Sequence, residues 1–271
     1  MRNSFQEFER AGWESVVAEY DAAFGSLTSQ AIEPLLNAVG ASRGVRLLDV
    51  ASGPGYVAAA AAKRGATAVG VDFSAPMVAE ARKRHPAVEF HEGDAEALPF
   101  PDRSFDAIVM NFAMLHLSRP ATALSEAHRA LRPEGRVGFT VWARPEETAG
   151  FDITLRAIQR HGDVNVALPH GPPFFRFSDP EECIRSLLNA GFLNPQVVKV
   201  PQSWRLTSPD SLFQIMRRGT VRTAGLLRAQ TSEALNAIRE AITDEARSYE
   251  RDGVIELPMP AVLASGLKPL A

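Results

Sequence analysis

The chain has 271 residues, of which 45% are hydrophobic and 23% are charged, a composition typical of globular proteins that excludes a disordered chain. Its formal net charge is -3 and it has no lysine- or arginine-rich block, so we expect no nucleic-acid partner. The one cysteine, Cys183, excludes an internal disulfide and a multi-cysteine zinc site, and we expect it to be buried.

Hydrophobic periodicity predicts two helices near the amino terminus, at 5–24 and 29–39. After them, short apolar runs alternate with helical segments. The predicted strands are 45–50, 67–71, 87–91, 104–111 and 136–142, and the predicted helices between them are 56–64, 75–84 and 121–131. Near-continuous apolar strands with helices between them indicate a parallel, doubly wound α/β sheet that is covered by helices on both faces.

The alternation ends after Trp142. We expect a helix at 146–160, a loop at 161–177 and a helix at 178–190 that opens with a capping box of Ser178 and Glu181. The remaining predicted segments are a strand at 196–200, a helical insert at 201–252 with a solvated face of Arg217, Arg218, Arg222 and Arg228, and a last strand at 254–263. Pro258 and Pro260 mark that last strand as a sheet edge.

No apolar run approaches the roughly 18 residues that cross a bilayer. Residues 1–10 contain no apolar stretch of the signal-peptide kind. The six histidines lack the spacing of a metal site, so we expect no metal. These features predict a soluble, cytoplasmic protein without a membrane span.

Doubly wound sheets bind ligands beyond the carboxyl ends of their strands. The first strand runs into Gly53-Pro54-Gly55, a turn that allows close approach of a ligand at the start of a helix. Asp72 ends the second strand 19 residues after Gly53, where a carboxylate reaches the two hydroxyls of a ribose. The turn and Asp72 together predict an adenosine-type cofactor. The third strand leads into residues 92–100, and a carboxylate at a strand end can accept the exocyclic amine of adenine.

Five stretches carry a family resemblance: 47–55, 70–74, 92–100, 104–109 and 131–137. In this order they resemble the class I S-adenosylmethionine-dependent methyltransferases, in the small-molecule branch typified by ubiquinone and menaquinone biosynthesis C-methyltransferases. The resemblance implies one Rossmann-like domain over 1–271. Its sheet would have seven strands, mostly parallel with the last strand antiparallel. Helices at 1–40 would cover the cofactor, and insertions at 143–178 and 201–252 would form a substrate cap.

The resemblance also implies roles for individual residues in S-adenosylmethionine binding. Asp49 and the backbone around Ala51, Gly53 and Gly55 would hold the amino-acid end, although the family often has glycine where this chain has Ala51. The adenosine end would be held by Asp72 at the ribose, Phe73 and Met77 beside the adenine, Asp94 at its amine and Ala95 against its ring, with Asn111 near the methionine end and Phe112 close to the line of methyl transfer.

Methyl transfer needs alignment of donor and acceptor, and a cationic sulfur favours aromatic neighbours. Trp13, Tyr20 and Phe112 are candidates, although the first two also suit the buried face of a helix. His116, just after the fourth strand, is our candidate general base, with Tyr20 as a second catalytic candidate. For the small-molecule acceptor we expect contacts from Trp13, Phe174 and Arg176, the last two lying on a segment that also suits a surface loop.

Three alternatives remain open. A nicotinamide oxidoreductase tolerates Ala58 where a third glycine is usual, but the motifs at 92–100 and 131–137 argue against it. A nucleoside-binding protein without turnover would keep the same aspartates. A protein or nucleic-acid methyltransferase is disfavoured by the net charge and by residues 111–114, Asn-Phe-Ala-Met. The sequence leaves open the acceptor, the accepting atom, and whether the protein is a monomer or a homodimer.

Overall fold

The structure, a computed structural model, describes residues 4–270 and divides the chain into two compact units. The larger unit contains residues 28–142, 172–200 and 261–270, and the smaller contains 4–27, 143–171 and 201–260. The predicted insertions at 143–178 and 201–252 fall mainly in the smaller unit. Residues 1–3 of the predicted amino-terminal cover lie outside the described residues. The roles predicted for these segments, cofactor cover and substrate cap, stay predictions.

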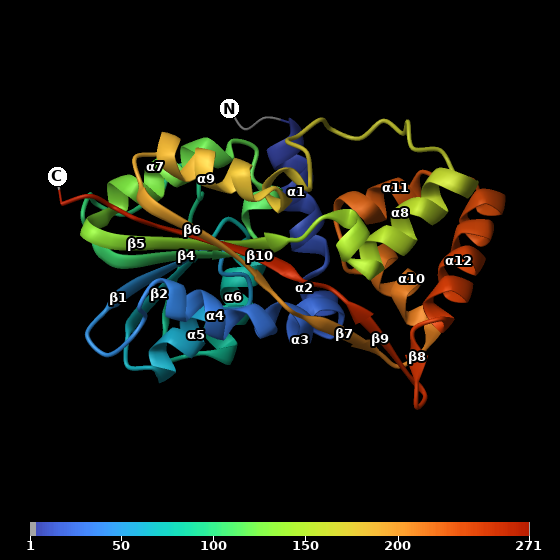
Figure 1. The fold of residues 1–271 in the computed structure, drawn as a ribbon, viewed down its shortest axis with the longest axis horizontal. Helices are drawn as coiled ribbons and strands as arrows, with labels where there is room; N and C mark the ends of the chain where they lie inside the picture. Colours follow the sequence, from blue (N-terminus) through green and yellow to red (C-terminus); the bar gives the residue numbers. More distant parts are fainter. Residues whose placement is uncertain (1–3, 271) are drawn as a thin grey trace. The chain divides into compact units, whose positions relative to one another are not determined.

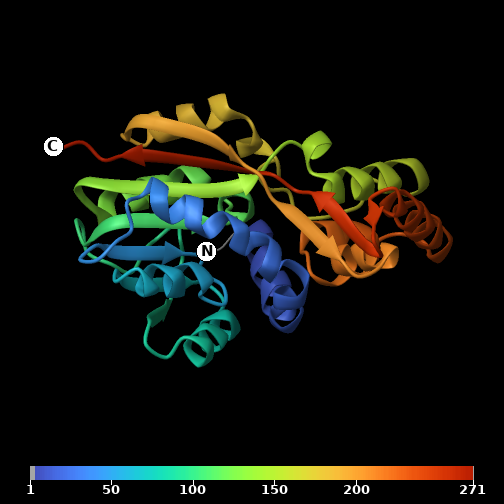
Figure 2. The same ribbon diagram turned by 60° about the horizontal axis from the view of Figure 1, so that its bottom comes forward.

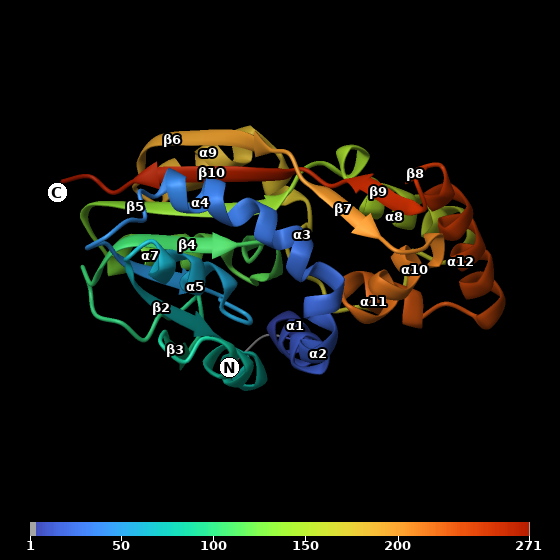
Figure 3. The same ribbon diagram turned by 90° about the horizontal axis from the view of Figure 1, so that it is seen from below.

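Within residues 4–270, the larger unit is built on a seven-stranded sheet in the order β3-β2-β1-β4-β5-β10-β6 (Figure 3). Strands β1 to β5 pair in parallel, and β10 pairs antiparallel with both β5 and β6. This confirms the predicted seven-stranded α/β sheet with its last strand antiparallel. The strands are β1 (Arg46–Val50), β2 (Thr67–Asp72), β3 (Glu89–Glu92), β4 (Phe105–Asn111), β5 (Leu131–Trp142), β6 (Leu193–Val200) and β10 (Ala261–Leu267).

Helices cover both faces of this sheet (Figure 1). On one face lie α4 (Ile32–Ala38), α5 (Tyr56–Lys63) and α6 (Ala75–Arg84), and on the other lie α7 (Pro120–Ala130) and α9 (Pro180–Asn189). The core between these layers contains Leu47, Leu48, Ile108 and Phe139, which are fully buried. Such burial explains why the inner strands read as continuous apolar runs.

Side-chain caps set the starts of two of these helices. Ser74 caps α6 by accepting the amide of Met77, as its position in the sequence predicts. The capping box predicted at Ser178 is wrong, because α9 begins at Pro180 and Asp179 is the cap, accepting the amide of Glu181. Ser178 instead donates its hydroxyl to the carbonyl of Phe175. As predicted, Cys183 is buried, and its thiol donates to the carbonyl of Phe177.

The carboxyl-terminal strand differs from its prediction. The expected edge strand at 254–263 is two strands, β9 (Val254–Pro258) and β10, with the second proline, Pro260, between them. Figure 2 shows β10, in red, between β5 and β6, which makes it an inner strand of the sheet. Its residues 261–264 are buried. Pro260 precedes the paired residues, so it removes no hydrogen bond from this ladder.

The smaller unit contains helices and, among the described residues, a three-stranded sheet in the order β7-β9-β8. The sheet lies in part of the region predicted to be wholly helical, where β7 (Ser203–Leu206) pairs with β9. The predicted helix at 5–24 is also interrupted. The remaining elements are α1 (Ser4–Ser15), α2 (Val17–Tyr20), the π-helix η1 (Asp21–Gly25), α8 (Ala149–His161), α10 (Pro209–Arg218), α11 (Arg222–Arg228), α12 (Ser232–Arg247) and β8 (Glu250–Arg251). Short turns complete the chain: α3 (Ser26–Thr28), η2 (Ser29–Ala31), η3 (Met114–His116), η4 (Pro145–Glu147) and η5 (Arg176–Ser178).

None of the helices in residues 4–270 has the length and apolar character needed to cross a bilayer. The same residues hold no group of three or more His, Cys, Asp or Glu side chains that could hold a metal ion.

Candidate active site

The turn after β1 is held in a left-handed backbone conformation at three positions. The φ angles are 55° at Ala51, 50° at Gly53 and 85° at Gly55. A side chain at Gly55 would meet the ring of Phe90 at 2.6 Å, so the close packing there needs glycine. At Gly53, in contrast, a Cβ atom would meet nothing within 4 Å. This turn therefore has an open side toward which its backbone can face a ligand.

Asp72 shapes this turn from the end of β2. Its carboxylate accepts the amide of Gly53 at 2.8 Å and the amide of Ser74 at 2.9 Å. Burial raises the pKa of Asp72 to about 6, and the bonds from these backbone amides oppose the rise. A carboxylate has more lone pairs than these two amides use, so it can accept further hydroxyl donors.

Asp49 lies one strand away and is also buried. Its Oδ2 accepts the amide of Ala58 at 3.0 Å, which fastens the first turn of α5 to β1. Burial raises the pKa of Asp49 to about 8, the Ala58 amide opposes this, and the charge of Asp72 adds to it. Two buried carboxylates thus share the carboxyl ends of neighbouring strands, an arrangement that favours a ligand with hydroxyl or cationic groups.

The segment after β3 carries the predicted adenine contacts. Asp94 is half-buried, and its Oδ1 accepts the amide of Glu96 at 2.9 Å. Ala95 is buried beside it. Phe73, half-buried, and Met77, buried, lie at the end of β2 and in the first turn of α6. The larger unit therefore contains all four residues, on the ends of β2 and β3 and the first turn of α6.

Asn111 and Phe112 at the end of β4 are held by a neighbouring threonine. The hydroxyl of Thr140 donates to Asn111 Oδ1 at 2.6 Å, and Asn111 Nδ2 donates to the Thr28 carbonyl at 3.3 Å. Phe112 has a φ of 54°, and its amide donates to the carbonyl and hydroxyl of Thr140. Its ring lies 4.1 Å from that of Trp142. A bulky residue held at positive φ costs on the order of 1–3 kcal/mol, and such strain concentrates at functional sites.

His116 ends the turn η3, which follows this strand. Its ring meets the ring of Phe174 edge-on at 5.9 Å, so the structure brings these two predicted residues together. Arg176 Nε donates to Glu182 at 2.7 Å, and its guanidinium lies over the ring of Phe177. The predicted contact of Arg176 with an acidic acceptor stays a prediction, and the side chain already has a protein carboxylate as partner.

Trp13 and Tyr20 belong to the smaller unit, where their rings meet edge-on at 5.8 Å. The indole of Trp13 donates to Glu9, a fully buried carboxylate that also accepts from Arg222 Nε at 2.7 Å. The prediction that Arg222 lies on a solvated face is wrong, because it neutralises this buried charge. The catalytic role of Tyr20 and the acceptor role of Trp13 stay predictions.

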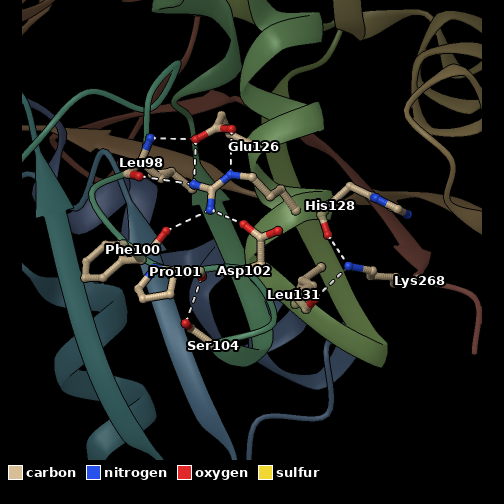
Figure 4. A network of polar contacts seen from close by, with 10 residues as sticks. Leu98, Phe100, Pro101, Asp102, Ser104, Glu126, His128, Leu131 and Lys268 are labelled. Atoms are coloured by element: carbon tan, nitrogen blue, oxygen red, sulfur yellow. Dashed lines mark hydrogen bonds and ion pairs between the residues drawn. The ribbon is translucent and has the colours of Figure 1, made fainter. Parts of the chain in front are cut away.

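The sequence-based prediction missed the polar network that anchors the loop after β3. Arg129 on α7 donates to the carbonyls of Leu98 and Phe100 and to the carboxylates of Asp102 and Glu126. Figure 4 shows Glu126 also accepting the amide of Leu98. In the same view, Lys268 donates to the carbonyls of His128 and Leu131, which ties the end of β10 to α7 and β5. No local sequence pattern predicts these pairings, because their partners are up to 140 residues apart.

Comparisons with known proteins agree with this geometry. A family described as "Methyltransferase domain" matches residues 48–139. A ubiquinone/menaquinone biosynthesis C-methyltransferase of Roseobacter denitrificans is 30% identical over 215 residues, which cover 69% of this chain and 86% of the relative. The chain belongs to the class I S-adenosylmethionine-dependent small-molecule methyltransferases. The open turn at 51–55, Asp49, Asp72 and Asn111 lie inside the matched segment. The two hydrogen-bond partners of Asn111, Thr28 and Thr140, lie outside it.

Two further similarities are partial. A demethylmenaquinone methyltransferase of Beutenbergia cavernae is 43% identical over 110 residues, which cover 41% of this chain and 46% of the relative. The chain thus spans about half the length of several curated relatives that it matches. A solved structure of Haemonchus contortus phosphoethanolamine N-methyltransferase 2 aligns with 99% of this chain and 61% of its own, at a TM-score of 0.59 and 19% identity. That likeness concerns the fold.

Proposed function

We propose that the protein transfers a methyl group from S-adenosylmethionine to a small-molecule acceptor. The observation that carries the proposal is the open, left-handed turn at 51–55, whose Gly53 amide is tied to the buried carboxylate of Asp72. The turn offers backbone groups to the amino-acid end of the cofactor, and the carboxylate offers acceptors to two ribose hydroxyls. The residues present therefore fit this cofactor.

The other predicted contacts extend the same site. Asp94 would accept the adenine amine, with Ala95, Phe73 and Met77 against the ring. The methionine end would lie toward Asp49 and Asn111. When bound, S-adenosylmethionine supplies a methyl group on a sulfonium, which already carries the driving force for transfer. The chain's contribution is then orientation, which in favourable cases lowers a barrier by about 7–11 kcal/mol.

Phe112 and His116 would act at the acceptor side. The ring of Phe112, fixed by its strained backbone and by Trp142, would face the cationic sulfur. His116 would take the proton of an acceptor hydroxyl or acidic carbon. The names of the relatives favour an acceptor of the quinone class, because one is a demethylmenaquinone methyltransferase and another is a ubiquinone/menaquinone biosynthesis C-methyltransferase. Phe174, which packs on His116, would contact such a planar acceptor.

The test is a transfer assay with isotopically labelled S-adenosylmethionine and a panel of demethylated quinones, phenols and amines. Mass spectrometry would follow labelled product together with S-adenosylhomocysteine. We expect acceptor-dependent turnover that His116→Gln lowers by at least about a hundredfold, as loss of a general base does. The contrary result is tight binding of S-adenosylhomocysteine while no acceptor in the panel raises the rate of its formation above the rate without acceptor. The protein would then bind the nucleoside without this turnover.

A further inference from the structure

Glu96 joins two segments of the candidate site that are more than 20 residues apart in the chain. Its side chain is only 2% exposed. Its carboxylate accepts the hydroxyl of Ser118 at 2.8 Å, the amide of Arg119 at 2.6 Å and Arg119 Nε at 2.8 Å. The carboxylate is thus buried yet fully supplied with donors, all of them from the segment that leads into α7.

One of the two joined segments, 94–97, is proposed to bind the adenine of the cofactor, and the other, 116–119, contains the residue proposed to act on the acceptor. Asp94 and Ala95 stand immediately before Glu96, and the Glu96 amide donates to the Asp94 carboxylate. Asp94 and Ala97 also form an isolated bridge, which makes 94–97 a tight turn. On the other side, Ser118 follows His116 by two residues. A short chain of hydrogen bonds therefore leads from the adenine side to the acceptor side.

We infer that Glu96 is a positioning residue that couples occupation of the adenine site to the placement of His116. The inference rests on the proposed function. A ligand that fixes Asp94 also fixes the amide and hence the carboxylate of Glu96, which holds Ser118 and Arg119 in place. The Arg129 network anchors the neighbouring residues 98–102 to α7, so Glu96 makes the direct side-chain link from this turn to residues 118–119.

Amide hydrogen exchange tests the coupling, with S-adenosylhomocysteine as the probe. In the wild-type protein we expect the ligand to protect both 93–98 and 112–119. In Glu96→Ala we expect protection of 93–98 to persist while that of 112–119 is lost, and the dissociation constant to rise about tenfold, the effect of one charge-assisted interaction. Glu96→Gln keeps a carbonyl acceptor and should restore part of the coupling, which a loss of folding would not allow.

Two further variants separate a specific loss of coupling from a general loss of structure. Arg119→Ala removes only the Nε contact of a side chain that is 64% exposed, so it should fold normally and weaken the coupling partially. Asp102→Asn is the matched control. Asp102 lies in the same loop as Glu96, and its carboxylate binds Arg129 on α7 but does not touch 116–119. In this variant the ligand should still protect both segments.

Equal protection of 112–119 in the wild type and in Glu96→Ala would overturn the inference. So would binding that protects 93–98 alone in the wild-type protein, and this outcome leaves the proposed function standing. Absence of any S-adenosylhomocysteine binding to the wild type would instead overturn the proposed function, and the inference with it.

Discussion

Replacing Asp72 with asparagine separates what this carboxylate does for the fold from what it does for the ligand. An asparagine has one acceptor oxygen, so either the Gly53 amide or the Ser74 amide faces its NH₂ group and loses its partner. An unpaired buried amide costs about 1–3 kcal/mol. However, the rise of the Asp72 pKa from 3.8 to about 6 means that holding its charge near neutral pH costs about 3 kcal/mol, which asparagine removes. We therefore expect a small net change in the free energy of unfolding.

The effect of the same substitution on binding should be large. The two ribose hydroxyls would lose bonds to a charged acceptor, each contributing about 1.5–3 kcal/mol, and asparagine recovers part of one. A net loss of about 2–4 kcal/mol corresponds to a dissociation constant for S-adenosylhomocysteine raised by roughly 30- to 1000-fold. Isothermal titration calorimetry measures the constant, and urea unfolding measures stability in parallel.

The matched control is Asp106→Asn. Asp106 lies near the start of β4, away from the strand ends that form the site, and its carboxylate also accepts a backbone amide, that of Arg46. We expect Asp106→Asn to bind S-adenosylhomocysteine with the same dissociation constant as the wild type. If Asp72→Asn binds S-adenosylhomocysteine within about threefold of the wild type, the assignment of Asp72 to the ribose is wrong.

Four other predictions concern stability, each measured by urea unfolding. The folded-state pKa of Asp49 is about 8 against 3.8 in the unfolded chain, so the folded protein binds more protons and its free energy of unfolding should fall as pH rises from about 4 to 8. Asp49→Asn should keep only the part of this decline up to about pH 6 that Asp72 contributes, and a pH profile parallel to that of the wild type would refute the shift. Thr140→Val should lower the free energy of unfolding by about 1–3 kcal/mol, because Asn111 Oδ1 loses the hydroxyl donor and the Phe112 amide keeps only the Thr140 carbonyl, whereas Thr140→Ser keeps the hydroxyl and should cost about 1 kcal/mol. Arg222→Met removes the ion pair from the buried carboxylate of Glu9 and should lower the free energy of unfolding by about 3–5 kcal/mol. Adding Glu9→Gln should recover most of this loss, and the recovery would not occur if the arginine only packs. Ala51→Gly removes the strain of an alanine in the left-handed conformation, about 1–2 kcal/mol, and costs about 0.5–1 kcal/mol because glycine makes the unfolded chain more flexible. The variant should be slightly more stable, and a lower free energy of unfolding than that of the wild type would contradict strain at Ala51.

The parts of the fold that local signals define were predictable. Helix α6 begins and ends at the predicted residues because a serine cap and a proline start it and His85 with Pro86 ends it. The strands β1, β2 and β4 were found within about two residues because burial on both faces writes a continuous apolar run into the sequence. The order of the motifs then led to the family before any geometry was known.

The missed features depend on partners that are distant in the chain. Nothing local shows that β10 inserts between β5 and β6, and its preceding prolines suggested an edge instead. The strands of the small sheet, such as Ser203–Leu206, are too short to show a period against the helices around them. Glu96 resembles a solvated loop residue in the sequence, because its donors lie 22 and 23 residues away. The side chain of Asn111 likewise finds its partner Thr28 across 83 residues.

The measurement that tests the cofactor assignment most directly is a calorimetric titration of the wild-type protein with S-adenosylmethionine, S-adenosylhomocysteine and NADH. The open turn and the ribose carboxylate predict micromolar binding of both sulfur nucleosides and none of NADH. Binding of NADH without binding of either sulfur nucleoside would contradict the methyltransferase proposal and the site roles built on it.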